Sequence, residues 1–444
     1  MRRSAPASDG LDENRSCWID EAPPCEPLPG LDRDAVADVA VIGGGLTGVS
    51  TAWHLAARFP ERRIALLEAR SLGNGASGRS GGQLLTGIAG VEPEDPEAAR
   101  RIYDVTRSGV DLVASWVERY GIDAGFARRG CIEVYTEGRT AELAHARVER
   151  LRGAGVALEW LPAERSGLAG ARGAVRDPAC GRVNALALLR GLRAVLLAQG
   201  VGVYERTPVL RVEEGREIRL ATPRAELRAG AVVLATDAYT PRLGYFRGAV
   251  LALHSHVVAT APLPEARWRA LGWHRWDAFS DDRDRIAFGC RTAGGRLLFG
   301  GGANDAYAYS LGGSPVHGGR GAARAFAALE RRLAASLPAA AGAPIAHRWT
   351  GPIGITLDRV CSIGVGGEHR NVYHALGYSG HGLALAALAG RVLSDLYAGD
   401  RAPWQGLPFL DRRPPRLPPE PLRWLGYRLY TAATGRSPRR RGPA

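Results

Sequence analysis

A glycine-rich turn near the start of the chain has a spacing suited to phosphate binding. Residues 43–48 read Gly-Gly-Gly-Leu-Thr-Gly, which fits the pattern G-x-G-x-x-G. In that pattern Gly43 permits a tight turn, Gly45 lets a pyrophosphate approach the backbone, and Gly48 lets the following helix pack closely on the strand. The start of that helix offers free N–H groups and a partial positive charge to phosphates. We therefore predict a dinucleotide site formed by Gly43, Gly45, Leu46, Thr47 and Gly48.

A carboxylate lies where the ribose of such a dinucleotide would be held. Glu68 follows Gly48 at the spacing of about 20 residues that is typical of a ribose-binding acidic residue. A carboxylate at this point accepts hydrogen bonds from both ribose hydroxyls and repels a 2′-phosphate, so FAD, NAD or both remain open. A chain with 58 glycines also produces such turns by chance. The alternative is therefore a purely structural glycine turn.

The elements that must position these groups are marked by hydrophobic runs. Residues 38–42 and 63–68 are apolar runs of strand length, and residues 46–59 between them have the spacing of an amphipathic helix. Strand, turn, helix and strand in about thirty residues form one βαβ unit. Further segments are predicted as buried parallel strands at 230–236 and 371–377, helices at about 95–120 and 140–155, and β-segments at about 248–302.

A second loop, dense in glycine and hydroxyl groups, follows the ribose-binding position. It runs Gly73-Asn74-Gly75-Ala76-Ser77-Gly78-Arg79-Ser80-Gly81-Gly82-Gln83. Beside a dinucleotide site, successive backbone N–H groups and the Arg79 guanidinium can bind a pyrophosphate. A flexible surface loop is the alternative. We assign Gly75, Ala76, Ser77, Arg79, Ser80, Gly81 and Gly82 to the cofactor.

Composition limits the remaining possibilities. A chain of 444 residues predicts two or three domains. The net charge of +13 comes from arginine alone, because the sequence has no lysine; this indicates a bias in composition and no nucleic-acid partner. The basic run at 436–441 is interpreted as a disordered tail, or else as an interaction arm. Scattered cysteines predict reduced thiols and no metal site, and no apolar run reaches spanning length, so we expect a cytoplasmic protein without membrane insertion.

The chain as a whole carries the pattern of a known flavoenzyme family. The matching segments are Cys17-Trp18, the turn from Gly43, GASGRSGGQ from Gly75, VNALALLRGL from Val183, LATDAYT from Leu234, GGRLLFGGG from Gly294, WTGPIGITLDR from Trp349 and GYSGHGLALAALAGR from Gly377. In order and spacing they resemble the D-amino-acid-oxidase (DAO) family of FAD enzymes, and within it the gamma-glutamylputrescine oxidoreductase-like branch. The resemblance implies an α/β fold: a glutathione-reductase-like FAD-binding Rossmann-type domain with an inserted α+β substrate domain built on an antiparallel sheet.

We divide the chain on this basis. The expected parts are an extended arm (1–35), a discontinuous FAD-binding domain (36–93, 180–247 and 345–400), a substrate domain (94–179 and 248–344) and a C-terminal tail (401–444).

The resemblance also implies further cofactor contacts. Val209 would bind adenine through its backbone, and Ala235 and Thr236 would lie beside the pyrophosphate. The start of an apolar helix would face the pyrimidine edge of the flavin, where its N–H groups stabilise negative charge. The complete additional set is Ala69, Arg70, Val209, Ala235, Thr236, Gly380, His381, Gly382 and Leu383. Because residues 350–353 hold no cysteine where some relatives tether flavin, we expect non-covalent FAD.

The implied activity is oxidation of the C–N bond of an amine or amino acid, as in gamma-glutamylputrescine oxidation. Hydride transfer to flavin N5 would give an imine that water hydrolyses to a carbonyl product. The electron acceptor is oxygen or another molecule; without lysine the chain lacks the cation that sarcosine-type relatives use to activate oxygen. Two alternatives stay open: the same scaffold acting on another C–H donor, such as a glycine- or sarcosine-like amino acid or a hydroxy acid, and a flavin-binding protein without turnover.

No catalytic base is assigned from the sequence. The expected substrate-pocket residues are Ser80, Trp349, Tyr378 and His381, because their motifs border the flavin. His54 is expected to be packed in its helix, and His254 and His256 are expected to share one side of a strand. Ser80, Ala185, Asp237 and Cys361 differ from the residues usual in the branch, so the substrate itself stays open.

Overall fold

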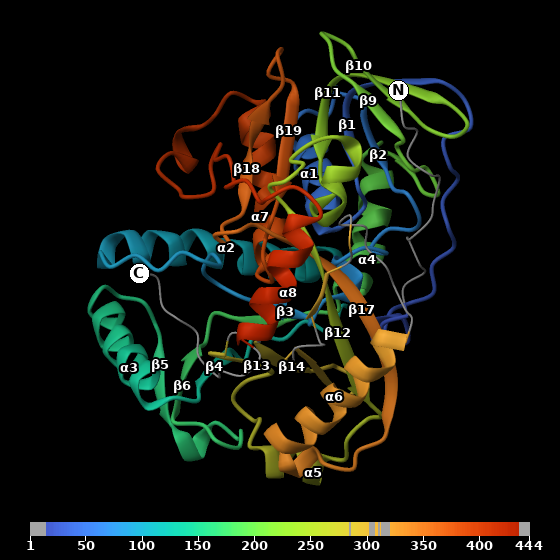
Figure 1. Cartoon of the computed structure of the whole chain (residues 1–444). Helices are drawn as coiled ribbons and strands as arrows, with labels where there is room; N and C mark the ends of the chain where they lie inside the picture. The colour runs from blue at the N-terminus through green and yellow to red at the C-terminus, as the bar shows by residue number, and fades with distance from the viewer. Residues whose placement is uncertain (1–14, 284–285, 302–306, 310, 312–319, 435–444) are drawn as a thin grey trace.

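Two β-sheets organise the protein, one in the upper and one in the lower part of Figure 1. The structure is a computed structural model that describes residues 15–283, 286–301, 307–309, 311 and 320–434. The basic run at 436–441, interpreted above as disordered, lies outside the described residues. No helix of the described chain is long and apolar enough to cross a membrane.

The first sheet has a parallel centre, as the apolar runs predict. Its main path is β18-β19-β11-β1-β2-β8, in which the pairs from β19 to β8 are parallel and β18 runs antiparallel to β19. The strands are β1 (Ala35–Ile42), β2 (Ile64–Leu67), β8 (Gly202–Tyr204), β9 (Arg211–Glu213), β10 (Ile218–Ala221), β11 (Glu226–Leu234), β18 (Ser362–Gly366) and β19 (Val372–Leu376). The four strands predicted from apolar runs are thus neighbours in one sheet.

Both faces of this sheet are covered, because alternate residues of β1 enter different cores. Val39 and Val41 face helices, whereas Ala40 and Ile42 face the β9–β10 side. The covering helices are α1 (Leu46–Arg58), α2 (Pro96–Tyr120), α4 (Ala185–Ala198) and α7 (Gly382–Tyr397). Burial on both faces is typical of parallel sheets and explains the continuous apolar runs.

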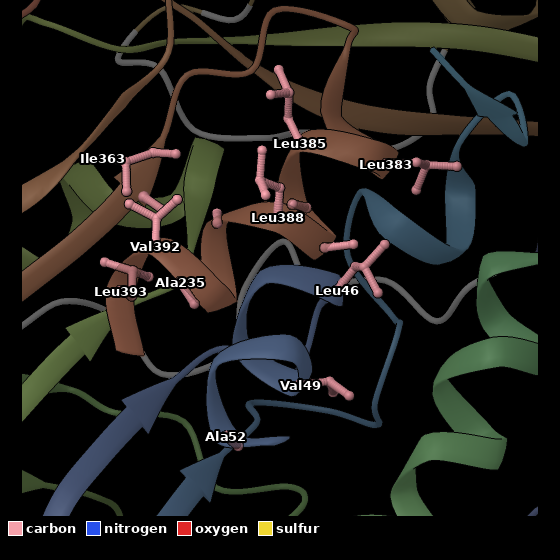
Figure 2. Packing of buried hydrophobic residues seen from close by; sticks show 14 of the residues in the cluster. Leu46, Val49, Ala52, Ala235, Ile363, Leu383, Leu385, Leu388, Val392 and Leu393 are labelled. Carbon is pink, nitrogen blue, oxygen red and sulfur yellow. The ribbon is translucent and has the colours of Figure 1, made fainter. Parts of the chain in front are cut away.

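Helices α1 and α7 lie in close contact. Figure 2 shows Leu46, Val49 and Ala52 of α1 in the same buried cluster as the α7 leucines. The helices approach closely because Gly390 lies against Ser50: a Cβ atom on Gly390 would be 2.2 Å from Ser50 Oγ. That hydroxyl donates to the carbonyl of Ala387 at 2.5 Å. The contact fixes the starts of both helices, which lie beside the candidate site.

The second sheet is mostly antiparallel, with one parallel pair between β4 and β13. Its path is β16-β12-β15-β14-β13-β4-β6-β5, with β17 paired to the other side of β12. The strands are β4 (Cys131–Tyr135), β5 (Glu159–Pro162), β6 (Gly173–Asp177), β12 (Leu251–Thr260), β13 (Ala278–Asp281), β14 (Ala287–Arg291), β15 (Leu297–Gly301), β16 (Tyr307–Ala308) and β17 (Ile345–Ile355). Three helices accompany it: α3 (Gly138–Gly153), α5 (Glu265–Leu271) and α6 (Arg320–Ser336). A short ladder, β3 (Gln83–Leu84) with β7 (Gly181–Arg182), stands apart.

Two segments pack with a different sheet from the one that the expected domain ranges imply. Strand β17, grouped above with the FAD-binding domain, pairs along β12 in the second sheet. Helix α2, grouped with the substrate domain, packs through Val110 and Val113 into the core of the first sheet. Gly109 permits this contact, because a Cβ atom there would lie 2.3 Å from the carbonyl oxygen of Ala384 on α7.

The described ends of the chain both pack on the body of the protein. The arm carries Trp18, which is buried and donates from its indole N–H to the carbonyl of Ser80 at 2.8 Å. Near the other end, residues 422–434 form helix α8 (Leu422–Thr434), drawn in red between the two sheets in Figure 1. The region 401–444, described above only as a tail, therefore contains a helix.

Candidate active site

One cavity of about 1340 Å³ runs from the carboxyl ends of β1 and β2 to the second sheet. Ligand cavities usually measure about 300–1,000 Å³, so this one has room for more than a small molecule. Its lining includes Tyr378 and all the predicted cofactor residues except Gly48 and Gly82. Trp349, which was predicted to lie in the substrate pocket, does not line the cavity either. The structure thus brings together segments that lie more than 300 residues apart in the chain.

The first glycine turn has the geometry that its sequence predicts. Gly43 has φ +108°, in the region that favours glycine, and a Cβ atom there would be 2.7 Å from the carbonyl oxygen of Ala235. Gly48 lies behind the turn, where a Cβ atom would be 1.9 Å from the carbonyl oxygen of Gly43. A side chain at either position would separate helix from strand. Gly48 therefore acts through packing rather than by lining the cavity.

Glu68 lies at the end of β2 and points back at the same turn. Its carboxylate accepts the N–H of Gly44 at 2.6 Å and the N–H of Arg70 at 2.9 Å. Burial raises the pKa of this carboxyl above its ordinary value, and the backbone hydrogen bonds oppose that rise. A carboxylate has about four lone-pair positions, so two remain for ribose hydroxyls.

The second loop closes over the first. Ser77 Oγ accepts the N–H of Leu46, the first residue of α1, at 2.9 Å. Arg79 is buried and donates to the carbonyls of Asn74 at 2.7 Å and Thr350 at 3.3 Å. The hydroxyl of Ser80 accepts the N–H of Gly82 at 3.3 Å. Because side chains and backbone hold it at several points, this segment is an ordered part of the site and not a loose surface loop.

Trp349 and Gly82 contribute from behind this loop. The indole N–H of Trp349 donates to the carbonyl of Arg79 at 3.0 Å, so the loop backbone separates the ring from the cavity. Gly82 has φ +74°, and a Cβ atom there would lie 2.6 Å from the Trp18 ring. Trp349, which was expected in the substrate pocket, does not line this cavity and supports the loop that carries Arg79.

The start of α7 completes the cofactor half of the cavity. Gly380 has φ +95°, and His381 is the residue that precedes the helix, with its N–H donating to the carbonyl of Tyr378 at 3.0 Å. Tyr378 is buried, and its hydroxyl lies 2.8 Å from Thr47 Oγ1 at the start of α1. Two helix N-termini, those of α1 and α7, thus face one cavity and favour negative charge in it.

Asp237 is a structural residue of the site that sequence reasoning did not identify. It follows the carboxyl end of β11 with φ +40°, and it accepts the N–H of Gly377 at 2.8 Å and of Gly354 at 2.9 Å. Burial raises the pKa of this carboxyl. Its side chain links β11 to β17 and to the segment before α7. Its place after a strand of the first sheet, at the edge where the cofactor binds, was the signal available in the sequence.

The other half of the cavity lies under the second sheet. Apolar walls come from Leu253 and Val257 of β12 and from Phe288 of β14. Carboxylates and arginines share this half: Glu133, Asp177, Asp281, Arg147 and Arg150. Burial raises the pKa of Asp281 to about 6. The arrangement offers apolar surface with a few charged groups, which is typical of a small-molecule site.

The histidines lie away from this half. His254 and His256 alternate with the β12 residues that line the cavity, so they share the opposite side of the strand, and the His256 ring meets Phe326 of α6 at 5.3 Å. His54 is packed against Trp53 and Trp116, and burial lowers its pKa to about 4. His54 is therefore packed in its helix, as expected. His254 and His256 do not line the cavity.

Comparison with known proteins agrees with this geometry. A model of the DAO family, described as FAD dependent oxidoreductase, matches residues 38–396. Gamma-glutamylputrescine oxidoreductase of Escherichia coli (strain K12) is 30% identical over 389 residues, covering 84% of this chain and 86% of that protein. Glycine oxidase of Geobacillus kaustophilus is 27% identical over 391 residues, covering 84% and 96%. A crystal structure of the latter has a TM-score of 0.71 at 25% identity, covering 85% of this chain and 99% of that one.

The chain belongs to the DAO family of FAD-dependent oxidoreductases. It is an enzyme with an FAD-binding fold, and the expectations of family, fold class and FAD as cofactor are confirmed. The residues fit this cofactor. The turn at Gly43 to Gly48 leaves room for a pyrophosphate at the start of α1, Glu68 lines the cavity at the end of β2, and the start of α7 faces the cavity from the other side.

Proposed function

We propose that this enzyme oxidises a carbon that carries an amine nitrogen. The proposed substrate is an elongated amine such as gamma-glutamylputrescine. Bound FAD supplies an acceptor for a hydride from such a carbon. The observation that carries the proposal is the continuity of one cavity from the cofactor residues to a half lined by carboxylates and apolar side chains. The relative that is 30% identical over most of both chains supports the same substrate class by its name.

The charged groups of the substrate half suit an elongated substrate. Asp281 and Glu133 attract a cationic amine, while Phe288 and Val257 contact a methylene chain and exclude water. Exclusion of water strengthens each electrostatic contact within the cavity. Arg147, which lies 3.3 Å from Glu133, adds a cation for a distant carboxylate. Because Glu133 and Arg147 lie side by side, they would bind an ammonium and a carboxylate at the same, non-reacting end of the substrate, and the amine-bearing carbon at the other end would extend toward the start of α7.

A second candidate is an amino acid such as glycine. It is favoured by the similarity to glycine oxidase, whose crystal structure this chain matches over 99% of its length. Arg147 and Arg150 would then bind the substrate carboxylate. The two candidates differ in length and charge, so a substrate panel separates them.

The test is anaerobic bleaching of the bound flavin. Purified enzyme is mixed without oxygen with gamma-glutamylputrescine, putrescine, glycine, sarcosine and a 2-hydroxy acid, and the visible flavin absorbance is followed. We expect the first compound to bleach FAD fastest, and its N-acetylated form, which lacks the basic amine, to leave the absorbance unchanged. Bleaching by glycine alone favours the second candidate, and bleaching by the hydroxy acid or by no compound contradicts the proposal. Repeating the reaction with oxygen or an artificial acceptor identifies which of them restores the colour.

We also propose that FAD is held without a covalent bond. Residues 350–353 of β17 carry no cysteine, and the two cysteines that line the cavity, Cys131 and Cys180, lie in its substrate half. Hydrogen bonding to Cys180 and burial raise the pKa of the Cys131 thiol, so it is a poor nucleophile. Acid precipitation should release intact FAD into the supernatant. Colour that stays in the pellet would contradict this assignment.

A cytoplasmic location is part of the same proposal. All six cysteines are free in the structure, which is typical of proteins kept in a reducing compartment. Cell fractionation tests the location, and recovery of the enzyme outside the cell contradicts it.

A further inference from the structure

Helix α8 exposes an apolar face that no described part of the chain covers. Leu422, Leu425 and Leu429 are 59%, 48% and 63% exposed, and their spacing of three and four residues places them on one side of the helix. Ala432 and Ala433 extend the same exposed side. Three leucines exposed to water forgo the stabilisation that burial of apolar side chains provides. We call Leu422, Leu425, Leu429, Ala432 and Ala433 the α8 face.

The opposite side of the helix is anchored to the protein. The Tyr427 ring contacts the Tyr309 ring at a centroid distance of 5.7 Å. Leu417, just before the helix, donates its N–H to the carbonyl of Gly248 at 2.5 Å, and the N–H of Trp424 donates to the Glu420 carboxylate at 3.2 Å. The ring contact with Tyr309 and the hydrogen bond of Leu417 hold the start and one side of α8 against the body, so the α8 face points away from it. The exposed leucines are therefore a property of the folded protein.

The charged residues of α8 and of the sequence that follows it all have one sign. Residues 422–444 contain six arginines and neither aspartate nor glutamate. Two of the six, Arg423 and Arg428, belong to the helix itself, and Arg428 lies over the Trp424 ring at 5.7 Å. The other four, Arg436, Arg439, Arg440 and Arg441, follow within a few residues of its end. An apolar stripe bordered by arginine and aromatic side chains is typical of helices that lie in the interface of an anionic bilayer.

Other occupants fit these observations less well. A second copy that paired α8 with α8 would cover the leucines but would bring no acidic side chain of this segment to the arginines, because residues 422–444 contain none. A nucleic acid would satisfy the arginines but would leave the leucines exposed to water. An anionic lipid surface satisfies both, because acyl chains accept the leucines and headgroups accept the arginines.

We propose that α8, together with the arginines that follow it, binds the protein to an anionic lipid surface. The helix lies in the surface without crossing it. Leu422, Gly426 and Tyr430 also line the rim of the active-site cavity, so this contact brings the cavity rim to the lipid. The proposal is independent of which substrate the enzyme oxidises.

Vesicle binding tests the proposal with the full-length, FAD-loaded enzyme. The protein is floated with vesicles of phosphatidylcholine alone, or of phosphatidylcholine with about one-third phosphatidylglycerol. We expect binding to the anionic vesicles to exceed binding to the neutral ones by about tenfold or more, and to fall by about tenfold when NaCl rises from about 0.05 to about 0.5 M. Equal binding to both vesicle types, or none, overturns the proposal.

Two sets of variants locate the contact. Leu425 and Leu429 do not line the cavity, so Leu425→Asp with Leu429→Asp should lower vesicle binding by about tenfold or more while leaving the flavin spectrum unchanged. Leu197→Asp, at a 44% exposed leucine of α4, is the matched control and should bind like the wild type. Replacing Arg436, Arg439, Arg440 and Arg441 by glutamine should reduce binding to anionic vesicles, whereas the same change at exposed Arg33, Arg216, Arg219 and Arg224 should not.

A measurement of mass in solution excludes the competing occupant. Analytical ultracentrifugation is run on the wild type and on the Leu425→Asp, Leu429→Asp variant without lipid. A wild-type dimer that the variant dissociates, with no vesicle binding, assigns the α8 face to a second copy and overturns the proposal. Vesicle binding by the double leucine variant at the wild-type level overturns it as well.

Discussion

The hydroxyl of Tyr378 lies 2.8 Å from Thr47 Oγ1, joining residues that are 331 positions apart in the chain. Thr47 belongs to the first turn of α1 and Tyr378 precedes α7, so this hydrogen bond ties together the two helix N-termini that face the cavity. Both side chains are buried. The tyrosine was expected to contact substrate, but its hydroxyl is already engaged within the protein, which indicates a positioning role.

Tyr378→Phe tests this role. Removing the hydroxyl leaves the buried Thr47 oxygen without its partner, so the free energy of unfolding should fall by about 1–2 kcal/mol, measured by urea denaturation. Tyr373→Phe is the control, because Tyr373 is buried in the same hydrophobic core and packs its ring against Tyr397. We expect little change there. Equal stabilities for Tyr378→Phe and wild type would show that the hydrogen bond contributes nothing.

Glu68→Ala should weaken FAD binding. The variant removes the acceptor for the ribose hydroxyls, and a hydrogen bond to a charged group contributes about 1.5–3 kcal/mol, so the Kd should rise by roughly one to two orders of magnitude. Titration of flavin-free protein with FAD, followed by quenching of flavin fluorescence, measures this. Glu61→Ala, at a 66% exposed side chain just before β2, should leave the Kd unchanged. An unchanged Kd for Glu68→Ala would contradict the ribose assignment.

The cofactor half of the site was predictable because its signals are local. The turn at Gly43, the spacing to Glu68 and the loop around Arg79 each depend on backbone conformation within a few residues, and glycine and charge patterns record that conformation directly. The parallel strands were predictable for a similar reason: burial on both faces requires continuous apolar runs.

Long-range contacts account for what the sequence did not reveal. Residues 345–355 were grouped with the FAD-binding domain because nothing local in the sequence shows which sheet they join, and β17 pairs with β12 of the second sheet. Asp237 gains its role only because Gly354 and Gly377 come within hydrogen-bonding distance from two other segments. Trp349 sits behind the loop that carries Arg79 for the same reason. Helix α8 was not predicted, although the spacing of Leu422, Leu425 and Leu429 is a helical signal in the sequence.

The last prediction concerns Asp281, whose side chain is 3% exposed on the cavity wall. Its carboxylate accepts the N–H of Ala287 at 2.8 Å and faces Arg283 at 3.5 Å and Arg332 at 3.9 Å, with Asp282 as the neighbouring like charge. Burial is the largest influence and raises its pKa from the ordinary 3.8 to about 6. Between these two values the folded protein therefore binds more protons than the unfolded chain, and the contribution of Asp281 to stability falls as the pH rises.

Asp281→Asn removes this titration, so the wild type should lose up to about 3 kcal/mol of unfolding free energy relative to the variant between about pH 4 and about pH 7. Urea denaturation of both proteins across that range measures the difference in their free energies of unfolding at each pH. The contributions of the other titrating groups are the same in both proteins and cancel in this difference. Asp400→Asn, at an exposed aspartate beyond α7, should track the wild type at every pH. If the difference between wild type and Asp281→Asn is flat, or if it grows in the opposite direction, the carboxyl is held in its charged form by Arg283 and Arg332 and burial is not the dominant influence.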